Sequence, residues 1–304
     1  LSDKVMTRAT THATGPYEVP NAKIDCYAMY TNNPPAGAFR GFGVTQSAFA
    51  VEQNMDILAR ELGMDPIELR KKNALRVGSI TATGQVLSNS VALVECLDWV
   101  ADEMDALKDA PMPETGLENA KIGWGVAAVY KNTGLGGGAP DAAQAFLKAH
   151  PNGTVEVRSS SADLGQGLTT VLAQFAGEVL GLPFEAIDVR LSDTDLAPDG
   201  GPTTASRQTY ITGNAVRLAA ERIRERLAAV AARRWGVPTE SVRFEEGALR
   251  TDEHAVAFAE AVRWLEEIGG DATVRLRYEA PQTRPLGEGG DMHFAFGFGV
   301  QAAQ

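Results

Sequence analysis

The chain has 304 residues, of which 44% are hydrophobic and 22% are charged, so it is long enough for a substantial core and for two domains. Its net charge of −11 argues against nucleic acid or anionic lipid as a partner, because both bind basic surfaces. Cys26 and Cys96 form no CxxC pair, which argues against a zinc ribbon, an iron–sulfur ligand set and a disulfide framework and favours a reducing, cytoplasmic compartment. No segment approaches the length of a membrane span.

The first part of the chain predicts mainly helices and loops. Residues 23–30 alternate with the period of a half-buried strand. Residues 79–90 have the composition of a loop, and the Pro- and Gly-containing segment 111–120 is predicted to link two domains, 1–110 and 121–304. Helices are expected at residues 5–11, at 47–62, from 66 onward after an Asp65 cap, and at 91–104.

The second part predicts alternating strands and helices. Strand 154–159, helix 168–180 and strand 187–191 have the lengths of a βαβ unit, so two parallel strands are expected. The predicted fold class is therefore a mixture of α+β and α/β. Further strands are expected at 122–130, 273–278 and 293–301, further helices at 206–234 and 258–268, and a hairpin around residue 247.

Residues 38–43, Ala-Phe-Arg-Gly-Phe-Gly, are the first candidate site. Arg40 offers a planar fork of donors for an oxyanion, and Phe42 offers a flat wall for a ring, between glycines that let the backbone approach a ligand. Taken alone, the stretch is more typical of a glycine-rich turn whose rings fill a core and whose Arg is solvated.

Two turns in the second part are further candidates, since each joins a strand to a helix. Residues 163–167 place glycines at the start of a helix, where free backbone N–H groups bind oxyanions, although a plain tight turn explains them equally well. Residues 199–208 combine hydroxyls, an amide and Arg207, and Ser206 has the alternative role of capping the long helix. Two such turns from neighbouring βα units would face one polar ligand.

The remaining candidates are single residues. Arg8 lies near His12 on the first helix and, without context, is interpreted as a surface charge. His150, His254 and His293 show no ligand spacing, so no metal bound by protein side chains is expected.

Residues 38–43 with Gln46, residues 164–167 and residues 202–206 occur in this order, at about these spacings, in one family. The chain resembles the molybdenum-cofactor-binding large subunit of xanthine dehydrogenase and aldehyde oxidase type hydroxylases, and the likeness runs from end to end. Residues 131–138 look closest to bacterial purine and nicotinate hydroxylases. The resemblance implies two consecutive molybdopterin-binding domains that contain βαβ units and are incomplete at both ends.

The resemblance also implies a molybdenum–molybdopterin cofactor, usually the cytosine dinucleotide form in bacteria, whose dithiolene holds the metal. By position, Arg40 matches the Arg beside the molybdenum, Phe42 the ring that stacks on the substrate, and Arg8 the Arg that binds a substrate oxygen. These three residues are the implied catalytic residues. The implied cofactor-binding residues are Phe39, Arg40, Gly41, Gln166, Gly167, Thr203, Thr204, Ala205, Ser206, Arg207 and Gln208.

The chain departs from the family pattern at its ends. The family's glutamate base lies beyond the equivalent of Gln304, and an earlier glycine-rich cofactor loop lies before Leu1, while Glu288 is interpreted as a loop carboxylate. We therefore expect a fragment or one part of a split subunit that is inactive alone. Its expected partners are the remaining segments of the molybdenum subunit, an iron–sulfur subunit and an FAD subunit.

The function that the resemblance implies is that of a molybdenum-dependent hydroxylase subunit. It would oxidise an N-heterocycle such as a purine with water-derived oxygen. The alternatives are an aldehyde or nicotinate dehydrogenase, a reductase of an aromatic thioester of the hydroxybenzoyl-CoA type, and a non-catalytic scaffold fragment.

Overall fold

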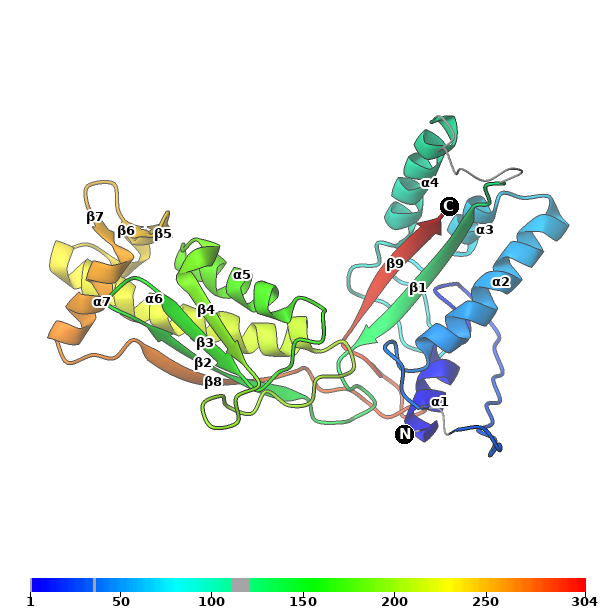
Figure 1. Cartoon of the computed structure of the whole chain (residues 1–304), viewed down its shortest axis with the longest axis horizontal. Helices are drawn as coiled ribbons and strands as arrows, with labels where there is room; N and C mark the ends of the chain where they lie inside the picture. The colour runs from blue at the N-terminus through cyan, green and yellow to red at the C-terminus, as the bar shows by residue number, and fades with distance from the viewer. Residues whose placement is uncertain (1, 35–36, 111–120) are drawn as a thin grey trace. The chain divides into compact units, whose positions relative to one another are not determined.

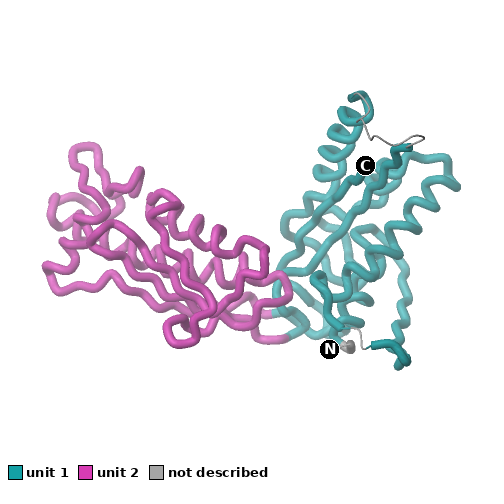
Figure 2. The backbone as a smooth tube through the Cα atoms, viewed as in Figure 1, with its two compact units in different colours: residues 1–138, 283–304 teal, residues 139–282 magenta. Residues whose placement is uncertain are grey.

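The computed structural model describes residues 2–34, 37–110 and 121–304, which fall into two compact units (Figure 2). Unit 1 is built from residues 1–138 and 283–304, and unit 2 from residues 139–282. The predicted linker 111–120 lies outside the described residues. Within these ranges, none of the helices combines the length and apolar character that crossing a bilayer requires.

Unit 1 contains two antiparallel strands that are far apart in sequence, β1 (Gly125–Thr133) and β9 (Ala295–Ala303), drawn side by side in Figure 1. Alternate residues of β1 are buried, so one face of the pair packs against a helical layer. Tyr130 faces Phe298 across the pair, with ring centroids 6.0 Å apart. The helices of unit 1 are α1 (Ser2–Thr11), α2 (Val44–Leu62), α3 (Pro66–Asn73) and α4 (Leu93–Asp109).

A buried polar network joins α2, α3 and β1. The carboxylate of Glu52 on α2 accepts hydrogen bonds from the Tyr17 hydroxyl (2.6 Å), Arg70 Nε (2.9 Å) and the backbone N–H of Ala128 (2.7 Å). Arg70 is fully buried and also donates to Asp56 (2.8 Å). A buried charge is tolerated only when it is paired in this way, so the network fixes the three elements relative to one another.

Unit 2 contains a four-stranded sheet in the order β4-β3-β2-β8. β3 and β4 are parallel and are joined through α5, which confirms the predicted βαβ unit, while β2 is antiparallel to both β3 and β8. Apolar residues of the sheet share one core with α5 and α6. The bounds are β2 (Ala142–Ala149), β3 (Val155–Ser159), α5 (Leu168–Leu180), β4 (Ile187–Leu191), α6 (Gly213–Trp235) and β8 (Thr273–Glu279).

A smaller antiparallel sheet completes unit 2. The strands β5 (Arg243–Glu245) and β6 (Ala248–Arg250) form the predicted hairpin around Gly247, and β7 (Ala255–Ala257) pairs with β6. Helix α7 (Phe258–Glu267) follows at once, and its apolar face joins the same core.

Two predictions of secondary structure are wrong. Residues 23–30 form no strand: Tyr27, Met29 and Tyr30 are exposed, and among the described residues the segment has no strand to pair with. The long helix predicted at 206–234 begins only at Gly213, after a π-helical turn over 208–212. Ser206 lies before this turn, with φ 54°, so it does not cap the helix. The strand β2 had not been expected, because its apolar residues are mostly alanines.

Replacing Glu52 by Gln tests the network in unit 1. Removing the Glu52 charge leaves the buried positive charge of Arg70 without its buried counter-ion. We therefore expect the free energy of unfolding to fall by roughly 3 kcal/mol or more. Denaturant titration measures it. The control is Glu225→Gln, which breaks an exposed pair with Arg222 and should change stability little. Similar small changes in both variants would contradict the role assigned to Glu52.

Candidate functional site

The turn that precedes α2 has an uncommon backbone. Gly41, Phe42 and Gly43 all have positive φ, at 100°, 55° and 102°. Such a φ is ordinary for glycine but rare for a bulky residue, where it is typical of functional sites. The Phe42 N–H donates to the Phe39 carbonyl (2.7 Å) and the Val44 N–H to the Gly41 carbonyl (3.2 Å), so the turn is closed on both sides.

Gly43 places this turn directly against α1. A Cβ on Gly43 would lie 2.1 Å from the carbonyl oxygen of Val5, so only glycine permits the approach. The turn that carries Arg40 and Phe42 therefore rests on the helix that carries Arg8. The side chain of Arg40 is exposed, and that of Phe42 is half-buried.

The guanidinium of Arg8 is bound by two uncharged acceptors. One N–H donates to Nε2 of His293 (3.0 Å), and another donates to the carbonyl of Leu135. Arginine has only donors, so Nε2 of His293 is the acceptor and the imidazole is neutral. Burial, followed by the positive charge of Arg8, lowers the pKa of His293 to about 2. Arg8 thus keeps a charge that His293 does not neutralise.

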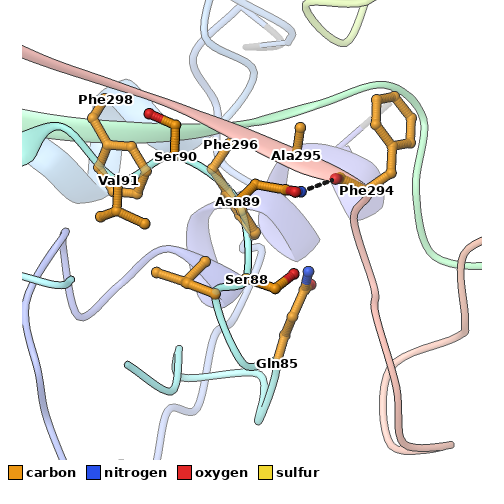
Figure 3. A pocket seen from close by; sticks show the side chains of 10 residues that line it. Gln85, Ser88, Asn89, Ser90, Val91, Phe294, Ala295, Phe296 and Phe298 are labelled. Atoms are coloured by element: carbon orange, nitrogen blue, oxygen red, sulfur yellow. Dashed lines mark hydrogen bonds between the residues drawn. The ribbon is translucent and has the colours of Figure 1, made fainter. Parts of the chain in front are cut away.

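The loop over 85–91 fixes His293 from the backbone side. The Gln85 amide donates to the His293 carbonyl (2.6 Å) and accepts from its N–H (3.1 Å). The side-chain amide of Asn89, in the same loop, donates to the carbonyl of Phe294, the residue after His293 (2.9 Å), as Figure 3 shows. On the other side, a Cβ on Gly136 would lie 2.0 Å from Nδ1 of His293. The imidazole therefore has little room to reorient.

The same loop and residues 294–298 line a small pocket, drawn in Figure 3. Its volume is about 10 Å³. That is room for about one water molecule and excludes an organic substrate. The pocket is a gap in the packing beneath β9 and not the candidate site.

The positive charge of Arg8 also affects two more basic side chains, His12 and Lys131. Nδ1 of His12 donates to the Arg8 carbonyl (3.0 Å), its Nε2 is buried without a hydrogen-bond partner in the described residues, and burial lowers its pKa to about 3. Burial, followed by the charge of Arg8, lowers the pKa of Lys131 to about 7. We call Arg8, His12, Lys131 and His293 the basic cluster. In the described part of the chain, no carboxylate contributes to the pKa of any of the four.

In unit 2 the structure brings the two candidate turns together. The Ala162 N–H donates to the Thr203 hydroxyl (2.9 Å), and the Gly200 N–H donates to the Ser160 hydroxyl (2.7 Å). The residues just before the first turn are therefore hydrogen bonded to the second turn, near the ends of β3 and β4.

Two polar side chains of the second turn hold it in place. Arg207 is fully buried, pairs with Asp141 (2.7 Å), and donates to the carbonyls of Gly200 (2.8 Å) and Pro202 (3.0 Å). The amide of Gln208 is likewise hydrogen bonded inside the protein, to hydroxyls that include Thr203 (2.9 Å). Any contact of Gln208 with a ligand would therefore use its backbone. The backbone of Arg207 is also occupied, because its N–H donates to the Thr204 carbonyl (3.2 Å) and its carbonyl accepts from the Ile211 N–H (2.7 Å).

The first turn is capped by its own acid. The carboxylate of Asp163 accepts the N–H groups of Gly165 (3.0 Å), Gly167 (3.3 Å) and Thr169 (3.1 Å), and these bonds, that from Thr169 first, lower the pKa of Asp163. The expectation that these glycine N–H groups are open to an oxyanion is wrong, because Asp163 already occupies them. Gln166 also folds back, donating to the carbonyl of Ala162 (2.9 Å).

The polar groups that stay available in unit 2 are on the second turn. Ala205 and Ser206 are consecutive left-handed residues, each with φ 54°. Among the described residues no acceptor binds their N–H groups, and the hydroxyls of Thr204 and Ser206 are exposed. Backbone donors beside hydroxyls suit a polar, oxygen-rich ligand such as a pterin nucleotide, so the residues present fit such a cofactor.

Residues 100–304 match a molybdopterin cofactor-binding domain family, and residues 1–74 match a second family of the same description. The chain belongs to the molybdopterin cofactor-binding domain family. It is 31% identical over 307 residues to a probable xanthine dehydrogenase subunit of Bacillus subtilis, covering 100% of this chain and 40% of the relative. It is 57% identical over 94 residues to the nicotinate dehydrogenase large molybdopterin subunit of Eubacterium barkeri. That match covers 31% of this chain and 22% of the relative.

The fold agrees with this assignment. The structure of quinoline 2-oxidoreductase from Pseudomonas putida 86 aligns with a TM-score of 0.76 and 26% identity, covering 99% of this chain and 40% of that one. The chain thus spans well under half of these relatives. In the described residues no group of three His, Cys, Asp or Glu side chains is placed to hold a metal ion.

Sequence reasoning missed Lys131, His293 and Gln85 as parts of the site. His293 meets Arg8 across 285 residues, and Gln85 meets His293 across 208. No local spacing encodes such contacts. The one available signal was that residues 131–138 belong to a distinctive motif.

Gly43→Ala tests the docking of the turn on α1. The added Cβ would meet the Val5 carbonyl, so we expect unfolding free energy to fall by about 1–3 kcal/mol more than in the control, Gly63→Ala. Gly63 also has a positive φ (62°), but a Cβ there meets no atom within 4 Å. Denaturant titration of both variants measures the difference, and equal losses would show that contact with α1 is unimportant.

The buried His12 predicts a pH dependence of stability. Its pKa is about 3 in the folded chain, against about 6.5 when unfolded, so between these values only the unfolded state binds the proton. Its contribution is fully present above pH 6.5 and is lost as the pH falls toward 3, by about 1.4 kcal/mol per pH unit. In His12→Phe the unfolding free energy should depend less steeply on pH between pH 4 and 6. The slope should be lower by up to about 1.4 kcal/mol per pH unit, which corresponds to one proton. An unchanged slope would mean that His12 is accessible to protons in the folded chain.

Proposed function

We propose that this chain is part of the molybdenum-cofactor subunit of a hydroxylase that oxidises an N-heterocycle such as a purine with water-derived oxygen. The observation that carries the proposal is the charge of Arg8, bound by neutral acceptors and without a carboxylate partner in the described residues, in a member of this family. A guanidinium in that state is available to an oxygen of a bound molecule.

The side chains of unit 1 take the following roles. Arg8 donates to a substrate oxygen and stabilises negative charge that develops on the ring during oxidation. Phe42 stacks on the substrate ring, and Arg40 lies beside the reacting centre. The left-handed turn 41–43 rests on α1, so the backbone that carries Arg40 and Phe42 lies next to the helix that carries Arg8.

The cofactor in this proposal is molybdenum–molybdopterin, in the cytosine dinucleotide form. When bound, it supplies the two-electron oxidation of the substrate carbon. The hydroxyls of Thr204 and Ser206 and the N–H groups of Ala205 and Ser206 are suited to its polar edge, and Gln166 and Gln208 would contribute through their backbone.

The partners in this proposal are the rest of the molybdenum subunit, an iron–sulfur subunit and an FAD subunit in the cytoplasm. Electrons leave the oxidised substrate through the last two. The general base is assigned to the remaining segments, since Glu288 lies exposed in a loop.

A second candidate substrate is nicotinate. The 57% identity with the Eubacterium barkeri subunit, although it covers only 94 residues, is the observation that favours it.

Arg8→Ala tests the proposal in the assembled complex. Loss of a charge-assisted hydrogen bond that strengthens in the transition state costs about 2–4 kcal/mol, so kcat/KM for a heterocycle carrying an oxygen should fall about 30- to 1,000-fold. Molybdenum content should be unchanged. Arg222→Ala, which removes an exposed arginine, is the control. Full activity in Arg8→Ala, or no molybdenum in the parent complex, would refute the proposal.

A further inference from the structure

The guanidinium of Arg8 is held by two acceptors that lie just beyond adjacent ends of β1 and β9. The strand β1 ends at Thr133 and β9 begins at Ala295, and these two residues pair with each other. Leu135 follows β1 and His293 precedes β9, and the Leu135 carbonyl and Nε2 of His293 each accept an N–H group of Arg8. A guanidinium has more N–H groups than these two contacts use, so the others can meet a ligand.

His293 is itself held from several directions. It is only 1% exposed, and the Gln85 amide binds both its carbonyl (2.6 Å) and its N–H (3.1 Å). The imidazole packs edge-to-face on Phe296, with ring centroids 5.6 Å apart and an angle of 83° between the planes. On another side, Gly136 lies so close that a Cβ there would clash with Nδ1. The Nε2 acceptor of Arg8 therefore has a fixed position.

The hydrogen bond to Arg8 leaves His293 with a polar group that is not satisfied. Because arginine only donates, Nε2 is the unprotonated nitrogen and the proton of the neutral ring is on Nδ1. In the described residues this buried Nδ1 has no hydrogen-bond partner. A buried N–H without a partner is rare and unfavourable, and such groups are typical of functional sites. The chain thus keeps an unfavourable group while it presents an acceptor to Arg8.

We propose that His293 is a positioning residue for Arg8. Its Nε2 holds the guanidinium in the orientation in which the free N–H groups of Arg8 meet an oxygen of the substrate, and Gln85 acts through His293 by fixing its backbone. This inference rests on the proposed function, because it deepens the role given there to Arg8. A displacement of about 1 Å in such a donor can lower a rate by about a hundredfold, so an acceptor that prevents it affects turnover without touching the substrate.

The first test uses the intact complex and two matched substrates, hypoxanthine and purine, which differ by one oxygen on the ring. His293→Phe keeps a ring but removes the acceptor, so kcat/KM for hypoxanthine should fall about ten- to a hundredfold. For purine, which offers Arg8 no oxygen, it should stay within about threefold of the parent value. His293→Gln, whose Oε1 can replace Nε2 as acceptor, should keep most of the activity on hypoxanthine. The control is His254→Phe, at a half-buried histidine of unit 2, which should change neither value.

A double-mutant cycle shows whether His293 acts through Arg8. In an Arg8→Ala background, His293→Phe should cause almost no further loss on hypoxanthine, because no guanidinium remains to be positioned. Gln85→Met removes the amide that binds the His293 backbone and should cause a smaller loss that is again confined to hypoxanthine. This variant decides the question if His293→Phe does not fold. Equal losses on both substrates, or additive losses in the double variant, would overturn the inference.

A second measurement, which needs no turnover, separates this inference from the proposed function. Phenylglyoxal modifies arginine side chains, and mass spectrometry gives the rate at each position in the intact complex. Arg8 should react at least about threefold faster in His293→Phe than in the parent, because one hydrogen bond fewer holds its guanidinium. The exposed Arg222 should react equally in both. An unchanged rate at Arg8 would overturn the inference. Faster modification in a complex that oxidises neither substrate would support the positioning role and refute the proposed function.

Discussion

The buried carboxylate of Glu52 is the interaction on which unit 1 depends. It joins Tyr17, α2, α3 and β1 through hydrogen bonds of 2.6–2.9 Å, and Arg70 compensates its charge. Because α2 begins directly after the 41–43 turn and β1 ends near Lys131, the same network fixes both sides of the candidate site. The geometry of such a pair is demanding, since an unpaired charge at this depth costs several kcal/mol. Stability and site geometry in unit 1 thus share one cause.

Unit 2 also contains a buried ion pair, between Arg207 and Asp141. The fully buried guanidinium of Arg207 binds carbonyls of the second turn and of β2, while the hydroxyls of Thr204 and Ser206 stay exposed. At the start of α5 the carboxylate of Asp163 accepts the N–H groups of Gly165 and Gly167, so these donors are not available to a ligand. Two turns that both join a strand to a helix therefore differ in the groups they leave available. In the second turn the charge of Arg207 is bound inside the protein, and in the first turn the carboxylate of Asp163 binds the N–H groups itself.

The net charge of the chain is negative, whereas the basic cluster is locally positive. The chain carries −11 overall, yet the basic cluster has no carboxylate partner in the described residues. Burial makes this possible, because within a low dielectric the nearest groups dominate the field and distant surface acids are screened. A chain with a net negative charge can thus contain a local cluster of basic side chains.

The sequence by itself determined the elements with strong local signals: the helix predicted at 47–62 and found at 44–62, the helix at 168–180, the Asp65 cap, the βαβ unit and the hairpin at Gly247. It also indicated the family through motifs whose order is distinctive. Tertiary structure decided the rest. Residues 23–30 alternate but have no partner strand within the described chain, and an alternating pattern forms a strand only where another edge can satisfy its backbone. The basic cluster joins residues up to 285 positions apart, and its pKa values come from burial, which no local spacing encodes.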